Sequence, residues 1–434
     1  MKIITNYLFA NIRYEKFYKW TKLVGITFTT QALIQILGLL SGILIIRLLP
    51  TTEYAFYTLA NTMLGTMTVL ADGGISSGVM AEGGKVWLDR QKLGIVVATG
   101  FKLRKTFAIF SLLVSMPILF YLLRNHGANL ITSFFIILSL IPSFYAVLSD
   151  NLLEISLKLH QEINKLQKNQ LFTGIWRFIM ISGSLFLFPW TFIAMLGNGI
   201  PRFWANIRLR KLSAEYAEPI KKVDPIVEKE ILSVVKRSLP GSIYYCVSGQ
   251  ITIWLISMFG STKSIAHLGA LGRIAVVLTI FSTLFSTLVI PRYARLTEDS
   301  KLLRWRFFQI QIALLSICVF IVGLVMIFPS QILWVLGKDY ANLHTEIILM
   351  AVSSSLSMLS SVTYFTLVSR GWIIRPVINI SINILFQLIL VFTMNLSKTK
   401  NVLMFSIVDF LVSYIILWIY FIYRINRLGA KDIL

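Results

Sequence analysis

The chain has 434 residues, of which 56% are apolar and only 14% are charged. Average soluble domains contain roughly 45–50% apolar and about 25% charged residues, so this apolar excess cannot be buried in one water-soluble core. The composition excludes a soluble enzyme and a disordered or collagen-like chain. It predicts a polytopic membrane protein.

The formal net charge is +22, from 41 Lys and Arg against 19 Asp and Glu. In a soluble domain this surplus would suggest nucleic acid as a partner, but in membrane proteins basic residues gather in cytoplasmic loops. Lys and Arg are strongly concentrated in the loops on the side of the N-terminus. We therefore expect both termini to be cytoplasmic, a location in the bacterial inner membrane and no nucleic-acid partner.

An apolar stretch of about 20 residues spans a bilayer as one helix. The sequence accordingly predicts an all-α fold with about twelve transmembrane helices in two six-helix bundles. The predicted spans of the first half are 23–46, 54–81, 106–123, 130–149, 171–188 and 190–206. Those of the second half are 239–259, 265–290, 307–328, 345–367, 376–394 and 401–422.

The longest polar stretch lies between the two sets of spans and predicts a linker. The expected organisation is a cytoplasmic interfacial segment at 1–22, a bundle at 23–206, a cytoplasmic linker at 207–238, a bundle at 239–422 and a cytoplasmic tail at 423–434. Both halves begin with a span, a short turn and a longer span. This shared pattern is typical of a parallel repeat, although only lengths and turns agree.

Polar side chains at bilayer depth are costly, so those that recur with helical spacing are informative. In the first predicted span, Gln31 and Gln35 share a face with Gly38 and Gly42, and Asn61 is on the polar face of the second span. Such stripes indicate either helix packing or a water-lined cavity. The paired glutamines favour a cavity, whereas packing is the better interpretation of the tenth-span serines Ser353, Ser357, Ser360 and Ser361.

Arg273 is predicted near the middle of the span 265–290, where an arginine costs at least about 2.5–3.5 kcal/mol. Its charge must face water, a carboxylate or an anionic ligand. Two interpretations remain open: an ion pair with Asp72 or Asp409, or an anion-binding group in a cavity. The guanidinium fork matches the geometry of phosphate, which favours the second.

Four other ionisable residues are site candidates. Arg177 could bind substrate, or its long side chain could extend to the membrane surface. Arg47 is either a charge at the rim or part of an entrance to the cavity. Asp72 and Asp409 could couple transport to a proton or cation, or could be structural caps and pairs.

The sequence contains no Walker A loop, HExxH or GxSxG motif and no cluster of Cys and His with metal-ligand spacing. We therefore expect no catalytic residue, no metal and no cofactor. The loops on the side opposite the termini are short, which leaves little room for the chemistry of a membrane polymerase. These observations predict a protein that is not an enzyme.

Four motifs resemble those of the polysaccharide transport family, the O-antigen and lipid-linked oligosaccharide flippases of the multidrug/oligosaccharidyl-lipid/polysaccharide exporter superfamily. They occur in order at predicted span ends and cover both halves: Ile43–Tyr57, Leu70–Ser77, Ile290–Leu296 and Leu336–Ala341. The resemblance implies two bundles around a central V-shaped cavity, with alternating access. The same superfamily contains the multidrug and toxin extrusion (MATE) transporters.

The resemblance further implies export of a polyprenyl-pyrophosphate-linked oligosaccharide, such as a repeat unit of O-antigen, capsule or exopolysaccharide. Membrane lipids, a polysaccharide polymerase and a chain-length regulator would be its partners. Arg273 is the candidate for the phosphates, and Gln31 and Gln35 are candidates for the sugars. The alternatives are a cation-coupled multidrug antiporter of the same fold, whose substrates would favour buried acids, and, less favoured, a polysaccharide polymerase.

Overall fold

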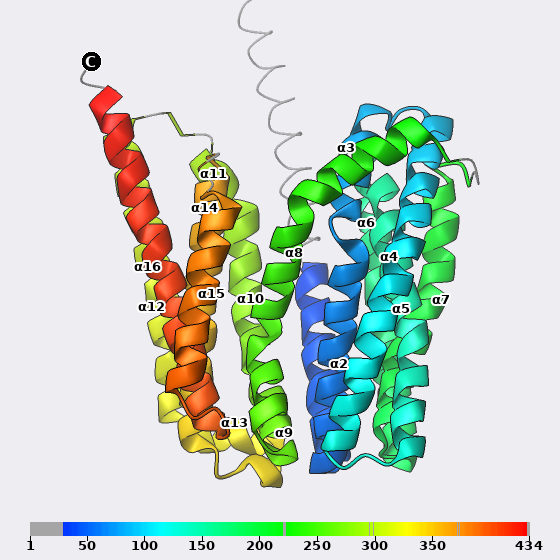
Figure 1. Cartoon of the computed structure of the whole chain (residues 1–434), viewed down its shortest axis with the longest axis vertical. Helices are drawn as coiled ribbons and strands as arrows, with labels where there is room; N and C mark the ends of the chain where they lie inside the picture. The colour runs from blue at the N-terminus through cyan, green and yellow to red at the C-terminus, as the bar shows by residue number, and fades with distance from the viewer. Residues whose placement is uncertain are drawn as a thin grey trace, which may run out of the picture.

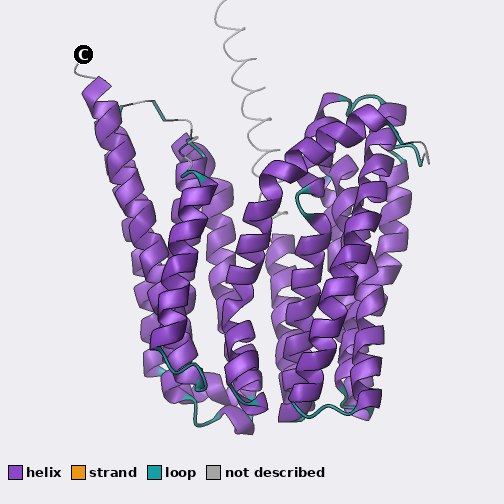
Figure 2. Cartoon of the chain, viewed as in Figure 1, coloured by secondary structure: helices purple, strands orange, loops and turns teal. Residues whose placement is uncertain are grey.

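The computed structural model describes residues 29–219, 223–294, 296–297, 299–370, 372 and 374–431. All regular secondary structure in this part of the chain is helical (Figure 2). The helices form two bundles that lie side by side (Figure 1). The predicted interfacial segment at 1–22 lies outside the described residues.

The first bundle contains the helix Thr29–Leu48, which is followed by six helices. These are α2 (Thr51–Asp72), α3 (Ile75–Lys85), α4 (Arg90–Asn125), α5 (Leu130–Leu159), α6 (Ile163–Leu187) and α7 (Thr191–Ala214). Asp89 and Asn129 cap α4 and α5 by accepting hydrogen bonds from backbone N–H groups of the first turn. Tyr54, Met63 and Met67 of α2 are fully buried in an apolar cluster to which both bundles contribute.

The second bundle is formed by the remaining elements, with α8 (Pro225–Phe259) connecting it to the first. They are α9 (Thr262–Leu271), α10 (Ile274–Leu284), the π-helical turn η1 (Phe285–Val289), α11 (Ile290–Ala294), α12 (Ser300–Ile327), α13 (Pro329–Leu336), the 3₁₀ turn η2 (Lys338–Tyr340), α14 (His344–Val368), α15 (Pro376–Thr393) and α16 (Thr399–Lys431).

Nine segments within the described residues are long and apolar enough to cross a membrane, with α9 and α10 together forming one of them. Two more helices, α2 and α7, have the length but are more polar, and α8 contributes the shorter apolar segment Ser248–Phe259. Protein surrounds these helices on several sides, so they need less apolar surface than a helix that faces lipid. With these three, the described helices account for the twelve predicted spans.

Two predicted spans are interrupted. The span 54–81 is divided between α2 and α3, because Gly73 and Gly74 adopt positive φ angles of 50° and 96° that end α2. The span 265–290 is divided at Gly272 and Arg273, which form a turn between α9 and α10. Sequence hydropathy did not predict either break, because both neighbouring segments are apolar.

The predicted linker at 207–238 is largely helical. Its first part extends α7 to Ala214, and its last part belongs to α8, which begins at Pro225. The start of α8 lies against the first bundle, where Lys102 of α4 forms a 2.9 Å ion pair with Glu228. Helix α8 then turns into the second bundle and contains Pro240 within its length (Figure 1). The predicted tail 423–434 likewise continues α16 as far as Lys431.

The two bundles contact each other at the end of the molecule that carries α13. Arg47 donates hydrogen bonds to the carbonyl oxygens of Trp334 (2.6 Å) and Val335 (2.9 Å), and Thr51 donates to Asp339. His126, at the end of α4, lies 2.8 Å from the carbonyl oxygen of Ser257 through Nε2. These contacts close the space between the bundles at this end.

A buried ion pair stabilises the first bundle at the break between α2 and α3. The Arg104 guanidinium, whose side chain is 2% exposed, contacts the carboxylate of Asp72. It also donates hydrogen bonds to Ser76 Oγ (2.6 Å) and to the carbonyl oxygen of Leu148. Asp72 therefore has a structural partner, as one of the two interpretations of this residue predicted.

Replacing this arginine should destabilise the protein. Breaking a buried ion pair costs about 3–5 kcal/mol, and we expect about 3 kcal/mol for Arg104→Ala because Asp72 is 23% exposed. The measurement is reversible unfolding in detergent. Lys92→Ala is the control, since the Lys92–Asp89 pair is exposed and should contribute little to stability. Equal losses for the two variants would contradict the assignment.

Candidate functional site

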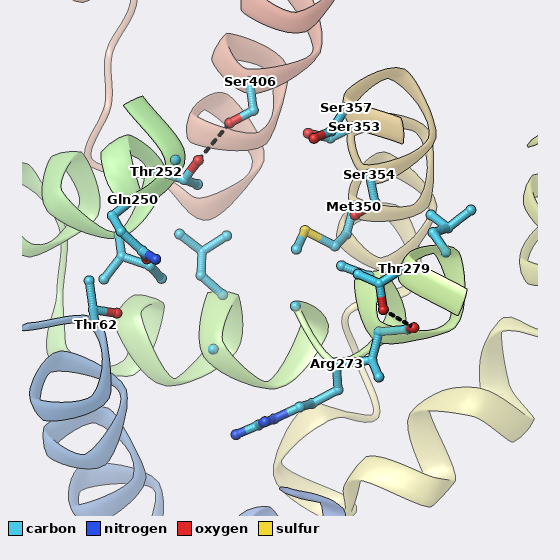
Figure 3. Close-up of a pocket in the computed structure, with 18 of the residues that line it drawn as sticks. Thr62, Gln250, Thr252, Arg273, Thr279, Met350, Ser353, Ser354, Ser357 and Ser406 are labelled. Atoms are coloured by element: carbon cyan, nitrogen blue, oxygen red, sulfur yellow. Dashed lines mark hydrogen bonds between the residues drawn. The ribbon is translucent and has the colours of Figure 1, made fainter. Parts of the chain in front are cut away.

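A cavity of about 590 Å³ lies between the two bundles. Helix α2 of the first bundle forms one wall, and α8, α9, α10, α14 and α16 of the second form the others. Figure 3 shows the side chains that line it. At one end the cavity is limited by the close packing of α9 on α2, where Gly269 lies directly against Thr58.

The lining is rich in neutral polar groups and contains no carboxylate among the described residues. Hydroxyl and amide groups come from both bundles. They belong to Tyr54, Tyr57, Thr58, Asn61, Thr62, Gln250, Thr252, Thr279, Ser282, Ser353, Ser354, Ser357, Ser361 and Ser406. Arg273 is the one charged side chain in this lining. The cavity is therefore polar, with a positive charge that no acidic lining residue offsets.

Arg273 lies at the turn between α9 and α10, and its side chain extends away from the serines of α14 (Figure 3). Its guanidinium lies near the side chains of Tyr54 and Tyr57. Within the described part of the chain, no carboxylate lies within 4 Å of it. The predicted alternative of an ion pair with Asp72 or Asp409 is therefore wrong, because these carboxylates lie against other side chains.

The guanidinium of Arg273 also lies against Gly42 of the Thr29–Leu48 helix, where a Cβ atom would be 2.9 Å from Nη1. Arg177 of α6 lies against Gly38, one turn earlier on the Thr29–Leu48 helix. A Cβ atom on Gly38 would be 3.3 Å from Arg177 Nη2. Arg177 therefore contacts the interior of the bundle, and the interpretation of a side chain extending to the membrane surface is wrong. Its Nε and that of Arg273 are buried without a hydrogen-bond acceptor among the described residues.

The other predicted substrate-binding residues have different locations. Asn61 lines the cavity. Gln31 and Gln35 are half-buried on the Thr29–Leu48 helix and are not part of the cavity lining, so contact with substrate stays a prediction for them. Arg47 is outside the cavity, where it joins the bundles through α13 and lies over the Trp334 ring at 5.1 Å. It is a rim charge that helps to close one end.

Asp409 of α16 is buried and accepts hydrogen bonds from Gln387 Nε2 at 3.1 and 3.2 Å. The Gln387 amide also lies 3.4 Å from Ser248 Oγ. Among the described residues, no Lys, Arg or His lies within 4 Å of this carboxylate. Elsewhere in the described part, no group of three or more His, Cys, Asp or Glu side chains is arranged to hold a metal ion.

Sequence reasoning assigned part of the lining correctly by periodicity but gave the wrong role to most of the α14 serines. Ser353, Ser357 and Ser361, each four residues apart, line the cavity, whereas Ser360 donates a 3.0 Å hydrogen bond to the Phe410 carbonyl oxygen in the packing between α14 and α16. The tyrosines beside Arg273 were missed. Both tyrosines precede Asn61 at helical spacing and share its polar face, and this periodicity could have identified them as lining residues.

Comparisons with known proteins identify the fold. No protein-family model matches the chain, and no curated protein sequence matches it. Among solved structures, an inward-facing multidrug resistance MATE family transporter of the MOP superfamily superimposes with a TM-score of 0.71. It is 14% identical, and the match covers 92% of this chain and 96% of the other. The chain has the MATE-like fold.

Two further structures support this assignment. An outward-facing MATE family transporter matches with a TM-score of 0.62 at 13% identity, covering 93% of this chain and 94% of the other. A MOP superfamily transporter from Pyrococcus furiosus matches with a TM-score of 0.58 at 12% identity, with the same two coverages. For that protein, a reversed polarity of the binding pocket is taken to suggest a different function. At these identities the likeness concerns the fold, which is that of a multi-pass membrane protein.

Neighbouring serines of α14 test whether the cavity contains water. In a cysteine-free background, we expect Ser361→Cys to react quickly with a charged thiol reagent, because Ser361 is exposed in the cavity lining. Ser360→Cys is the matched control and should react at least about tenfold more slowly, since Ser360 is buried between helices. Equal rates would contradict the assigned faces of α14.

Proposed function

We propose that this chain is an alternating-access transporter that moves an anionic, lipid-linked substrate of the polyprenyl-pyrophosphate oligosaccharide class across the membrane. The single observation that carries the proposal is the cavity between the bundles, which contains Arg273 and no carboxylate among its described lining residues. Within a membrane, such a charge favours an anionic ligand.

The remaining lining fits the other parts of such a substrate. A guanidinium binds phosphate oxygens through two parallel N–H groups. The serine, threonine, asparagine and glutamine side chains of the cavity can donate and accept hydrogen bonds, as sugar hydroxyl groups require. The cavity therefore offers separate polar groups for the phosphates and for the sugars of one molecule.

The arrangement of the bundles supports entry from the side of the termini. The contacts of Arg47, Thr51 and His126 close the opposite end. The inward-facing MATE structure superimposes with the higher TM-score of the two named conformations. With both termini in the cytoplasm, as the distribution of basic residues predicts, this conformation would receive substrate from the cytoplasmic side.

A cation-coupled multidrug antiporter is the second candidate, and the MATE-like fold is the observation that favours it. Cationic drugs would require an acidic group in the cavity, whereas its one charged lining residue is an arginine. Asp409, buried without a basic partner among the described residues, is a candidate for ion coupling under either proposal.

The test is translocation of a fluorescent polyprenyl-diphosphate sugar by the purified protein in liposomes. We expect Arg273→Ala to reduce the rate about 10- to 100-fold, since a charge-assisted hydrogen bond contributes about 1.5–3 kcal/mol. Arg273→Lys should recover part of the loss, because it keeps the charge without the fork.

Arg306→Ala, which removes an exposed arginine of α12 outside the cavity, is the control and should transport at the normal rate. The melting temperature of Arg273→Ala should stay close to that of the unaltered protein, because the change leaves no carboxylate unpaired. A fully active Arg273→Ala protein would refute the proposal. An Arg273→Ala protein that still moves the diphosphate sugar but has lost transport of a cationic dye would also refute it.

A further inference from the structure

Two glycines of the Thr29–Leu48 helix face two arginines that come from different bundles. Gly42 lies against the guanidinium of Arg273, which belongs to the second bundle. Gly38 lies against the guanidinium of Arg177 on α6, which belongs to the first. Residues four apart in a helix are separated by about 6 Å along its axis and share a face. The two guanidinium groups therefore pack against one face of this helix, at positions one turn apart.

Neither arginine forms an ion pair with a carboxylate among the described residues. Arg177 lies within electrostatic reach of Tyr57, Arg202 and Arg273. No hydrogen bond or ion pair joins Arg177 to another described residue, and its Nε is buried. The Nε of Arg273 is also buried without an acceptor among these residues. Leaving such donors unpaired is costly, so a ligand that accepts from both is favoured.

We propose that Gly38 and Gly42 are positioning residues of a two-arginine anion site, in which Arg177 and Arg273 contact the same anionic group. This inference rests on the proposed function, and it adds the second arginine and the residues that give both guanidinium groups their places. Because each bundle contributes one arginine, an anion bound here contacts both bundles at once.

The glycines act by leaving space. A methyl group on Gly42 would lie 2.9 Å from Nη1, 3.0 Å from Cζ and 3.1 Å from Nε of Arg273, so the whole guanidinium would have to move. A methyl group on Gly38 would lie 3.3 Å from Arg177 Nη2 and would require a smaller shift. Pairs of glycines four apart usually allow two helix backbones to approach, but here the nearest atoms are those of flexible side-chain ends.

Equilibrium binding of farnesyl diphosphate to the full chain in nanodiscs tests the proposal, with farnesol as the probe without an anionic group. We expect Arg177→Ala, Arg273→Lys and Gly42→Ala each to weaken farnesyl diphosphate binding about tenfold, and Gly38→Ala to weaken it less. Gly42→Ala should not lower the melting temperature, because alanine forms helix better than glycine. Gly183→Ala is the matched control, since a Cβ atom there meets nothing within 4 Å.

A double-mutant cycle separates positioning from helix packing. In the Arg273→Lys background, Gly42→Ala should have no further effect, because the fork it displaces is already gone. An effect of the same size in both backgrounds would indicate packing and would overturn the inference, as would unaltered binding by Gly42→Ala. If neither arginine substitution changes binding of farnesyl diphosphate, the proposed function itself fails.

Discussion

The positive charge of Arg273 at the junction of α9 and α10 is the feature on which this account depends. An arginine inside a membrane-spanning region costs several kcal/mol unless water or an anion compensates its charge. Its neighbours Tyr54 and Tyr57 contribute phenolic side chains rather than carboxylates. The fold therefore keeps a cation beside a polar cavity, and we infer that the cation has a ligand.

Other arginines of the first bundle show the contrast. Arg104 contacts Asp72, and Arg202 donates a 3.0 Å hydrogen bond to Asp150 through Nε. Arg104 is buried and Arg202 is partly exposed, and each is matched with a carboxylate, which makes these pairs structural. Arg177 lies in the same bundle without such a match among the described residues, and it contacts the same face of the Thr29–Leu48 helix as Arg273. We propose that these two unmatched cations on one glycine-lined face form a binding site rather than a packing interaction.

The architecture explains how such a site could alternate between the two sides of a membrane. Hydrogen bonds of Arg47 to α13 and of His126 to α8 join the bundles at the end that carries α13. These contacts involve a few side chains and backbone carbonyl groups, so they can break without unfolding either bundle. An anion held between Arg177 and Arg273 would connect the bundles at a different level and could therefore influence which end is closed.

Hydropathy and helical periodicity were sufficient to predict the number of spans, the two bundles and a polar face that includes Asn61. They could not predict the breaks at Gly73 and Gly272, because a break depends on backbone angles and on neighbouring helices. They also left the partner of Asp72 undecided, since Arg104 is far from it in the sequence. The contact between Gly42 and Arg273 depends on tertiary packing, which periodicity within one helix does not contain.

The most direct test of the central claim is the charge preference of the cavity. Farnesyl diphosphate and the lipophilic cation tetraphenylphosphonium should be compared as ligands of the same purified protein, with displacement of one by the other measured at equilibrium. The account predicts that the diphosphate binds and that the phosphonium ion neither binds tightly nor displaces it. Tight binding of the phosphonium ion, with no binding of the diphosphate, would contradict the account.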